Sequence, residues 1–232
     1  MYYLFISFYY LYFTPILAGF SKCLYYHERF GMMNLSPGGE NMEDIDIDEL
    51  KPTTMVEYFE NERKSKFDVG YVLKHNDQYA LMRTIDTEGR LDNYELIDLT
   101  KEVPVFNTGT PYLKQMIEYR TLATEYGLKD TPQIKIIEDL PFKEPLQEVL
   151  DYLSQSEVNF EVVTINKKNK KKDRIGSMKH RKPGQFSLIS RAVDDPFDPI
   201  LNEEHKIKLK KIEIVCFNSW ELILLTDLIK ND

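Results

Sequence analysis

Cysteine is scarce in this 232-residue chain, which contains only Cys23 and Cys216. Beyond Met42 there is only Cys216, so this larger part of the chain cannot form an intramolecular disulfide and does not require an oxidising compartment. Cys216 stands in an apolar run, residues 212–217. We therefore expect its thiol to be a core group rather than a nucleophile.

Motifs for catalysis or ligand binding are also missing. Three of the four histidines, His75, His180 and His205, are not spaced with cysteine or with one another as metal ligands are. There is no Gly-rich phosphate loop and no Gly-x-Ser-x-Gly element. The Asp-rich segments 86–92 and 194–198 lack the oxygen set of a calcium loop, and we expect solvated hairpin loops there. We predict no catalytic residue, metal site, cofactor or small-molecule substrate; a hydrolase that uses the Asp clusters remains an alternative.

The first 41 residues differ in composition from the rest. The chain has 15 Tyr and 13 Phe residues, and 12 of these 28 aromatic residues lie in this segment, in runs such as Tyr2-Tyr-Leu-Phe-Ile. Non-coding DNA rich in A and T encodes such runs, and the codons of Gly38-Gly-Glu-Asn-Met42 can contain a bacterial ribosome-binding signal. We expect residues 1–41 to be a mistranslated leader, and Met42 to start a cytoplasmic protein.

A membrane anchor is the alternative for the same segment. Residues 2–20 carry no charge, and about 20 apolar residues can span a bilayer as a helix. Pro15 and the many tyrosines, which favour the membrane interface over its centre, count against this alternative. A signal peptide lacks support, because the basic n-region and the small-residue cleavage site are absent. If residues 1–41 are genuine, the chain is a single-pass membrane protein.

Two stretches of the chain carry the same landmarks in the same order. Gly70 and the pair Phe106-Asn107 recur as Gly176 and the pair Phe217-Asn218. The offset grows from 106 at the glycines to 111 at the phenylalanines, as insertions in loops would cause. We infer an internal repeat in which these pairs occupy equivalent strands. The alternative is a chance similarity between two β-rich segments.

Apolar periodicity predicts strands separated by polar turns in each repeat, and helices at the repeat ends. In the helix expected between Pro111 and Gly127, the inward face consists of Leu113, Met116 and Ile117. The predicted fold is α+β and mostly antiparallel β, with two tandem small β-barrel-like repeats that each carry accessory helices. The expected domains are residues 42–130 and 143–232, joined by a linker over residues 131–142.

The stretch Gly70-Tyr-Val-Leu-Lys-His-Asn-Asp77-Gln-Tyr79-Ala-Leu81 resembles the Sm-like and SH3-like small β-barrel proteins. The resemblance implies a five-stranded barrel. The RNA pocket of the Sm-like family is not matched, because Tyr79-Ala80 and Leu99-Thr-Lys101-Glu stand where that family has its nucleotide-binding residues. Fold alone does not give function.

A basic run stands out from an acidic background. From Met42 onward the chain has 28 Lys and Arg against 36 Asp and Glu, yet residues 167–182 hold nine Lys and Arg and one Asp. We expect a basic loop at 167–182 that contacts phosphates, with no interleaved aromatic side chain for base stacking. The predicted binding residues are Lys167, Lys168, Lys170, Lys171, Lys172, Arg174, Lys179, Arg181 and Lys182.

We predict a non-enzymatic binding module whose basic loop contacts nucleic acid or an acidic protein partner. One alternative is a scaffold or homo-oligomer that pairs through exposed barrel edges. The bland alternative is a loop that is merely solvated.

Overall fold

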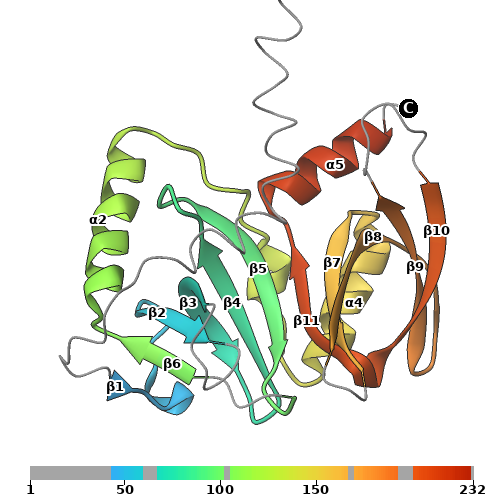
Figure 1. Cartoon of the computed structure of the whole chain (residues 1–232), viewed down its shortest axis with the longest axis horizontal. Helices are drawn as coiled ribbons and strands as arrows, with labels where there is room; N and C mark the ends of the chain where they lie inside the picture. Colours follow the sequence, from blue (N-terminus) through green and yellow to red (C-terminus); the bar gives the residue numbers. More distant parts are fainter. Residues whose placement is uncertain (1–42, 60–66, 102–104, 167–169, 193–200, 231–232) are drawn as a thin grey trace, which may run out of the picture. The chain divides into compact units, whose positions relative to one another are not determined.

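Eleven strands form one antiparallel sheet, and helices pack against it (Figure 1). The structure is a computed structural model that describes residues 43–59, 67–101, 105–166, 170–192 and 201–230. The prediction of an α+β, mostly antiparallel fold is confirmed. The predicted leader or anchor, residues 1–41, and the Asp-rich segment 194–198 lie outside the described residues. Within those residues, no helix has both the length and the apolar character needed to cross a membrane.

The chain divides into two halves that contain similar sets of strands and helices. The first half contains β1 (Glu43–Asp44), the 3-10 helix η2 (Ile47–Glu49), β2 (Met55–Phe59), β3 (Phe67–His75), β4 (Tyr79–Ile85), β5 (Leu91–Asp98), β6 (Val105–Thr108) and α2 (Pro111–Glu125). The connecting segment carries α3 (Lys135–Glu138). The second half contains α4 (Pro145–Ser156), β7 (Phe160–Ile165), β8 (Lys171–Lys182), β9 (Gln185–Ala192), β10 (Leu201–Lys208), the 3-10 helix η3 (Leu209–Lys211), β11 (Ile212–Phe217) and α5 (Trp220–Lys230).

Both halves use the same strand order. The first half is ordered β6-β2-β3-β4-β5, and the second is ordered β11-β7-β8-β9-β10. In each half, four strands form a meander and the fifth returns to pair with the first, before a helix follows. The agreement extends over five strands and one helix in each half.

Finer features of the two halves also correspond. Gly70 on β3 and Gly176 on β8 each lie where a Cβ would collide with a carbonyl oxygen of the next strand. In both strands a register shift begins two residues later, after Val72 and after Met178. A glycine followed by a bulge bends a strand and lets its neighbour approach closely. Each half therefore bends at the same place.

Phe106 and Phe217 lie on the corresponding strands β6 and β11, as the repeat predicts, but not at equivalent positions. Phe217 lies opposite Phe160, which in turn pairs with Gly176. In the first half the residue paired with Gly70 is Val56, whereas Phe106 lies opposite Tyr58. The two phenylalanines thus differ by two positions in register, and they belong to different clusters of buried side chains.

The two predicted separate barrels are not confirmed, because the halves share one sheet. Closure of the first half would require β5 to pair with β6. Instead, residues 94–97 of β5 pair with residues 214–217 of β11. Contacts accordingly group residues 42–232 as one unit. An edge strand with apolar side chains favours a partner, and β11 is the partner that β5 finds.

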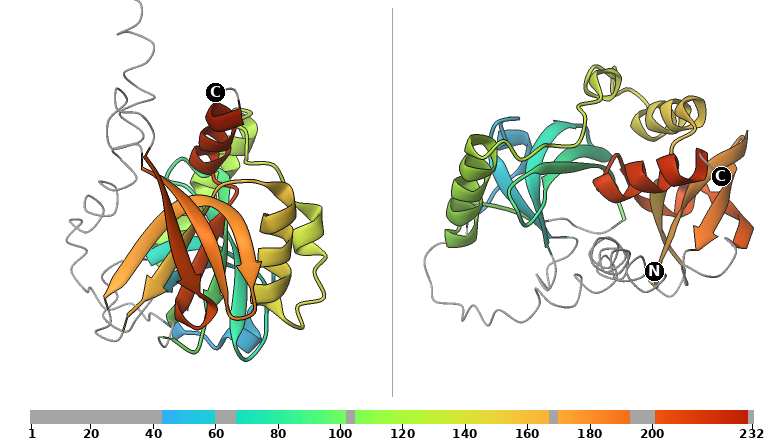
Figure 2. Two further views of the ribbon diagram at one scale, coloured as in Figure 1. Left: turned by 90° about the vertical axis from the view of Figure 1, so that its right-hand side faces the viewer. Right: turned by 90° about the horizontal axis from the view of Figure 1, so that it is seen from above.

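The main core lies on the side of the sheet that α3 and α4 cover (Figure 2, right). Val149, Leu150 and Leu153 of α4 pack against buried side chains from both halves, and Ile137 and Phe142 join the same cluster. The segment predicted as a linker is therefore packed into the fold. A second cluster fills the opposite face of the first half.

Helix α2 covers the outer part of the first half, and part of its predicted inward face is wrong. Leu113 and Met116 are buried as predicted, and both contact the strands of this half. Ile117, however, is 51% exposed, while Ala123 is buried. At 100° per residue, Ala123 shares the face of Met116, whereas Ile117 has already turned away from the sheet.

A stack of three side chains crosses the junction between the halves. The Tyr94 and Phe217 rings are nearly parallel, with centroids 5.5 Å apart. The Arg83 guanidinium lies 4.2 Å from the centre of the Tyr94 ring. Arg83 also donates hydrogen bonds to the carbonyl oxygens of Asp92 (3.0 Å) and Thr131 (2.9 Å). The two acceptors and the ring face compensate the buried guanidinium for its lost hydration. The hydrogen bond to Thr131 also attaches the connecting segment to the sheet.

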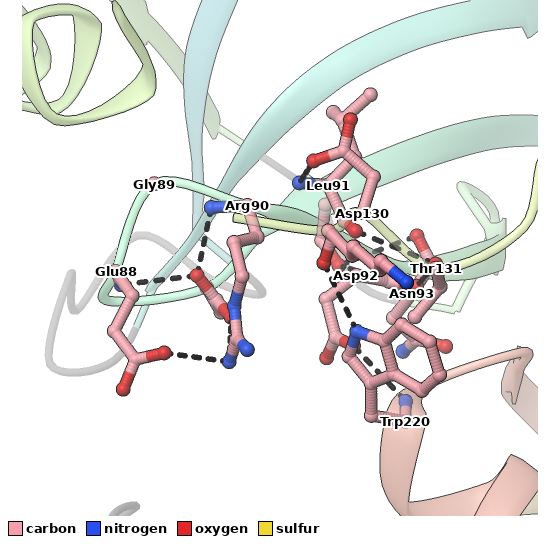
Figure 3. Close-up of polar contacts among 12 residues, drawn as sticks. Glu88, Gly89, Arg90, Leu91, Asp92, Asn93, Asp130, Thr131 and Trp220 are labelled. Atoms are coloured by element: carbon pink, nitrogen blue, oxygen red, sulfur yellow. Dashed lines mark hydrogen bonds and ion pairs between the residues drawn. The ribbon is translucent and has the colours of Figure 1, made fainter. Parts of the chain in front are cut away.

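Polar contacts reinforce this junction near the β4–β5 turn (Figure 3). An Asp92 carboxylate oxygen accepts a hydrogen bond from the backbone N–H of Trp220, 3.1 Å away at the start of α5. The indole N–H of Trp220 donates to the carbonyl oxygen of Lys129, and Asp130 accepts from the backbone N–H of Leu91. Burial, the largest effect, raises the pKa of Asp92 to about 6, although the Trp220 hydrogen bond acts to lower it.

The glycine positions give the first testable prediction. Gly176→Ala should lower the free energy of unfolding by about 1–3 kcal/mol or more, because the new methyl group collides with the Ile189 carbonyl oxygen. Gly184→Asn is the matched control: Gly184 has open space around its Cβ position and a φ of 75° that Asn tolerates. Urea unfolding of both variants measures the difference. Equal stability of the two variants would contradict the close strand approach.

The buried carboxylate of Asp92 gives the second prediction. Its pKa of about 6 lies above the ordinary value of 3.8, so the native state binds this proton more tightly than the unfolded state does. Stability should therefore fall as pH rises from about 4 to 6. Asp92→Asn keeps an acceptor for Trp220 and removes the titration. It should unfold like the wild type at pH 4 and be more stable at pH 7.5 by about 2 kcal/mol. If Asp92→Asn is less stable than the wild type at pH 7.5, the folded protein favours the charged form of Asp92, and the prediction is wrong.

Candidate anion-binding cavity

The basic run is mostly a strand rather than the predicted loop. Residues 171–182 form β8, which pairs with β7 on one side and with β9 on the other. The many lysines of the run indicated a solvated loop. The run also contains Ile175 and Met178, however, and Met178 packs against the main core. The two neighbouring strands satisfy the backbone of β8, so the charged side chains can remain outside while the strand is held. Lys167 and Lys168 lie outside the described residues.

Alternation along β8 separates the charges of its first half. Lys171 faces the buried Glu213 of β11 and forms an ion pair of 2.6 Å with it. Asp173 shares that face, where burial and then the charge of Asp173 raise the pKa of Glu161 to about 7. Lys172 and Arg174 point to the other face. The acidic groups and the remaining basic groups therefore lie on opposite sides of the strand.

The second half of β8 has carboxylates beside its charges. Lys179 pairs with Glu204 of β10 at 3.1 Å, and a hydrogen bond from Ser187 followed by the Lys179 ammonium lowers the pKa of Glu204. Arg181 forms an ion pair with Asp151 of α4. Lys182 is exposed at the end of the strand. This part of the predicted site is largely neutralised within the fold.

The first half of β8 borders a cavity of about 210 Å³ between the β7–β8 hairpin and the segment formed by β10 and η3. None of the described residues that line it carries a carboxylate. The cavity wall includes Thr164, Asn166, Ile165 and Ile207. Its basic residues are Lys170, Lys172, Arg174, Lys206, Lys208 and Lys211. Six cationic residues thus line a small concave space.

The path of the chain after β10 brings the two sides of the cavity together. The backbone N–H of Leu209 in η3 donates to the carbonyl oxygen of Gly184, 3.0 Å away. Immediately after η3, Ile212 pairs with Thr164 of β7. The end of β10 is therefore held beside the β7–β8 hairpin. Figure 2, left, shows the strands of the second half, coloured orange to red, as curved and twisted ribbons.

Sequence reasoning identified three of the six basic residues and missed the other three. Lys170, Lys172 and Arg174 belong to the predicted run, while Lys206, Lys208 and Lys211 lie more than 30 residues later. A signal for the second group exists, since the segment 206–211 holds four lysines in six residues. Only the register of β10 and the turn at η3 reveal that this segment faces the first.

The guanidinium of Arg174 is the least exposed of the cavity's cationic groups. Its Nε atom is buried and makes no hydrogen bond to the described part of the protein. A guanidinium offers five N–H donors in a planar arrangement that matches the oxygens of a phosphate or carboxylate. With five lysines also lining the same space, the cavity can bind an oxyanion of high charge.

Comparisons with known proteins give no match: no protein-family model, no curated protein and no solved structure matches this chain. The candidate site therefore rests on its geometry and charge.

Charge repulsion inside the cavity gives the third prediction. The double variant Lys172→Gln, Lys208→Gln should raise the melting temperature at low salt by about 2 °C, because it relieves repulsion between like charges. This gain should shrink as added salt screens the remaining charges. The matched control, Lys179→Gln with Arg181→Gln, removes two cations that have carboxylate partners and should give no gain. Thermal unfolding at low and at high NaCl concentration distinguishes the two; equal behaviour of the pairs would refute the repulsion.

Proposed function

We propose that this protein is a non-enzymatic binding module that holds a phosphate-rich polyanion, with nucleic acid as the favoured partner, in the basic cavity. The observation that carries this proposal is the cavity of about 210 Å³, which is lined by six cationic residues and by no carboxylate among the described residues. Unpaired like charges in one place cost stability, and natural proteins retain such local conflicts mainly at functional sites.

Several features favour phosphates over the carboxylates of an acidic protein. Arg174 supplies a planar set of donors, and lysine ammonium groups are common phosphate binders. The site is also concave, so a compact anion can reach several cations at once, whereas the carboxylates of a protein surface are spread over a wider area. An acidic protein partner remains an outcome of the experiment below.

The expected mode of nucleic-acid binding follows from the cavity's composition. No aromatic side chain is among its described lining residues, so base stacking does not contribute there. Binding through phosphates alone is largely independent of sequence and strongly dependent on salt. Because the whole chain has a net charge of −8, the attraction is confined to the neighbourhood of the cavity, within a Debye length of about 8 Å at physiological salt.

The fourth prediction tests this proposal. The triple variant Lys206→Gln, Lys208→Gln, Lys211→Gln should weaken binding to a short single-stranded RNA or DNA by at least about tenfold, because it removes half of the cavity's cations. The slope of log affinity against log salt should flatten by about 0.7–0.9 for each phosphate that the variant no longer neutralises. Fluorescence anisotropy over a range of NaCl concentrations, from about 25 to 200 mM, measures both quantities.

The matched control removes the same number of lysines from exposed positions outside the cavity, as Lys114→Gln, Lys135→Gln, Lys143→Gln. This control should retain the wild-type affinity. If the two triple variants weaken binding equally, overall charge rather than the cavity determines affinity. If the wild type binds neither RNA nor DNA at the lowest salt concentration, the nucleic-acid proposal fails and an acidic protein partner takes its place.

We also propose that the two halves are Sm-like or SH3-like units that arose by duplication. The shared order of five strands, the glycine opposite the next strand and the bulge after it support this origin. The units are barrel-like in their bending, and the β5–β11 pairing joins them.

Assembly through exposed strand edges is the second candidate function, and it has weaker support. In the part of the chain that the structure describes, β10 pairs only with β9 and takes the place in its half that β5 takes in the first. The two strands can be aligned through the pairing that starts beside Gly70 in the first half and Gly176 in the second. In this alignment, Glu204 and Lys206 of β10 occupy the positions of Tyr94 and Leu96 of β5. Charged side chains on an edge disfavour further pairing, and β1 already pairs with β6 at the other end.

A further inference from the structure

The cavity is too small for a whole nucleotide with its base. Its volume of about 210 Å³ is below the range of about 300–1,000 Å³ in which drug-sized ligands bind. One phosphate group or a short chain of them fits this space, while a sugar and base must remain outside it.

The charge of the cavity also exceeds what a strand passing over it would supply. A phosphodiester carries one negative charge, whereas a terminal phosphomonoester carries about 1.5 to 2 near pH 7, since its second pKa is about 6. A terminal triphosphate concentrates still more charge in one place. A small space lined by six cationic residues is best matched by an anion that brings several charges into it.

The position of the donors points the same way. Arg174 and Lys172 come from β8 on one side of the cavity, and Lys208 comes from β10 on the other. Ile207 is buried and forms part of the wall between them. Cationic residues on both sides of the cavity can bind a terminal phosphate, which carries more charge than a diester within the strand.

We propose that the cavity binds the terminal phosphate group of a nucleic-acid strand, and that it holds a terminal triphosphate more tightly than a monophosphate. This inference rests on the proposed function, since it names the part of the nucleic acid that the same site recognises. The rest of the strand then lies outside the cavity. Affinity depends on the chemistry of the end and little on the sequence of the bases.

The test compares three short RNAs of one sequence that differ only at the 5′ end: hydroxyl, monophosphate or triphosphate. Wild-type protein should bind the triphosphate form about tenfold more tightly than the hydroxyl form, as one or two added charge-assisted hydrogen bonds would give. The monophosphate form should lie between them, and its advantage over the hydroxyl form should shrink as the pH falls below about 6, where the second phosphate proton binds. Lys206→Gln, Lys208→Gln, Lys211→Gln should reduce the preference to less than about twofold, while the control at Lys114, Lys135 and Lys143 should preserve it.

The outcomes separate this inference from the proposed function. If the three RNAs bind the wild type equally and the cavity variant abolishes that binding, the proposed function stands and the end-recognition inference is wrong. If no RNA binds, the end-recognition inference fails, and if DNA of the same sequence does not bind either, the nucleic-acid proposal fails with it. Inorganic tripolyphosphate at millimolar concentration should displace the triphosphate RNA from the wild type. Another outcome is that tripolyphosphate raises the melting temperature of the wild type but not that of the cavity variant, while no RNA binds. In that case the ligand is a free polyphosphate rather than a strand end.

Discussion

The pairing of β5 with β11 is the constraint on which the rest of the structure depends. It joins residues 94–97 to residues 214–217 and places the Tyr94 ring against the Phe217 ring. Both rings are fully buried, and the guanidinium of Arg83 covers the outer face of Tyr94. Removal of a buried aromatic side chain costs about 3–5 kcal/mol, so this stacked pair alone is a large share of the stability of an ordinary domain. Without it, the molecule would be two short bent sheets with exposed apolar edges.

The cavity depends on the other pairing of β11, the one with β7 in the second half. Because β11 is fixed between β5 and β7, the chain that enters it through η3 must start beside Thr164. That requirement places the lysines at the end of β10 next to those of β8. The bend after Gly176 gives the second half its curvature. The cationic cluster is therefore a product of long-range topology, and no single segment of the chain contains it.

The sequence predicted those features whose causes are local. Alternating apolar residues and turn signals identified a mostly antiparallel α+β fold, and the recurring glycines identified two halves whose strand order turned out to be the same. The features that depend on distant partners were missed. Nothing near Tyr94 indicates that β5 pairs with β11. A lysine-rich run does not reveal that β7 and β9 flank it, or that Glu213, Glu204 and Asp151 neutralise Lys171, Lys179 and Arg181. Ile117 was misplaced because three apolar residues of α2 span more of the helix surface than the sheet covers.

Lysine footprinting by mass spectrometry tests the central claim that a phosphate-rich ligand occupies the cavity. The protein is acetylated with and without a saturating 5′-triphosphate RNA, and the reactivity of each lysine is compared. The account predicts joint protection of the five cavity lysines, while exposed lysines outside the cavity remain reactive. The protected set is Lys170, Lys172, Lys206, Lys208 and Lys211, and the reactive set includes Lys114, Lys135 and Lys143. Protection confined to other lysines, or spread evenly over both sets, would contradict it.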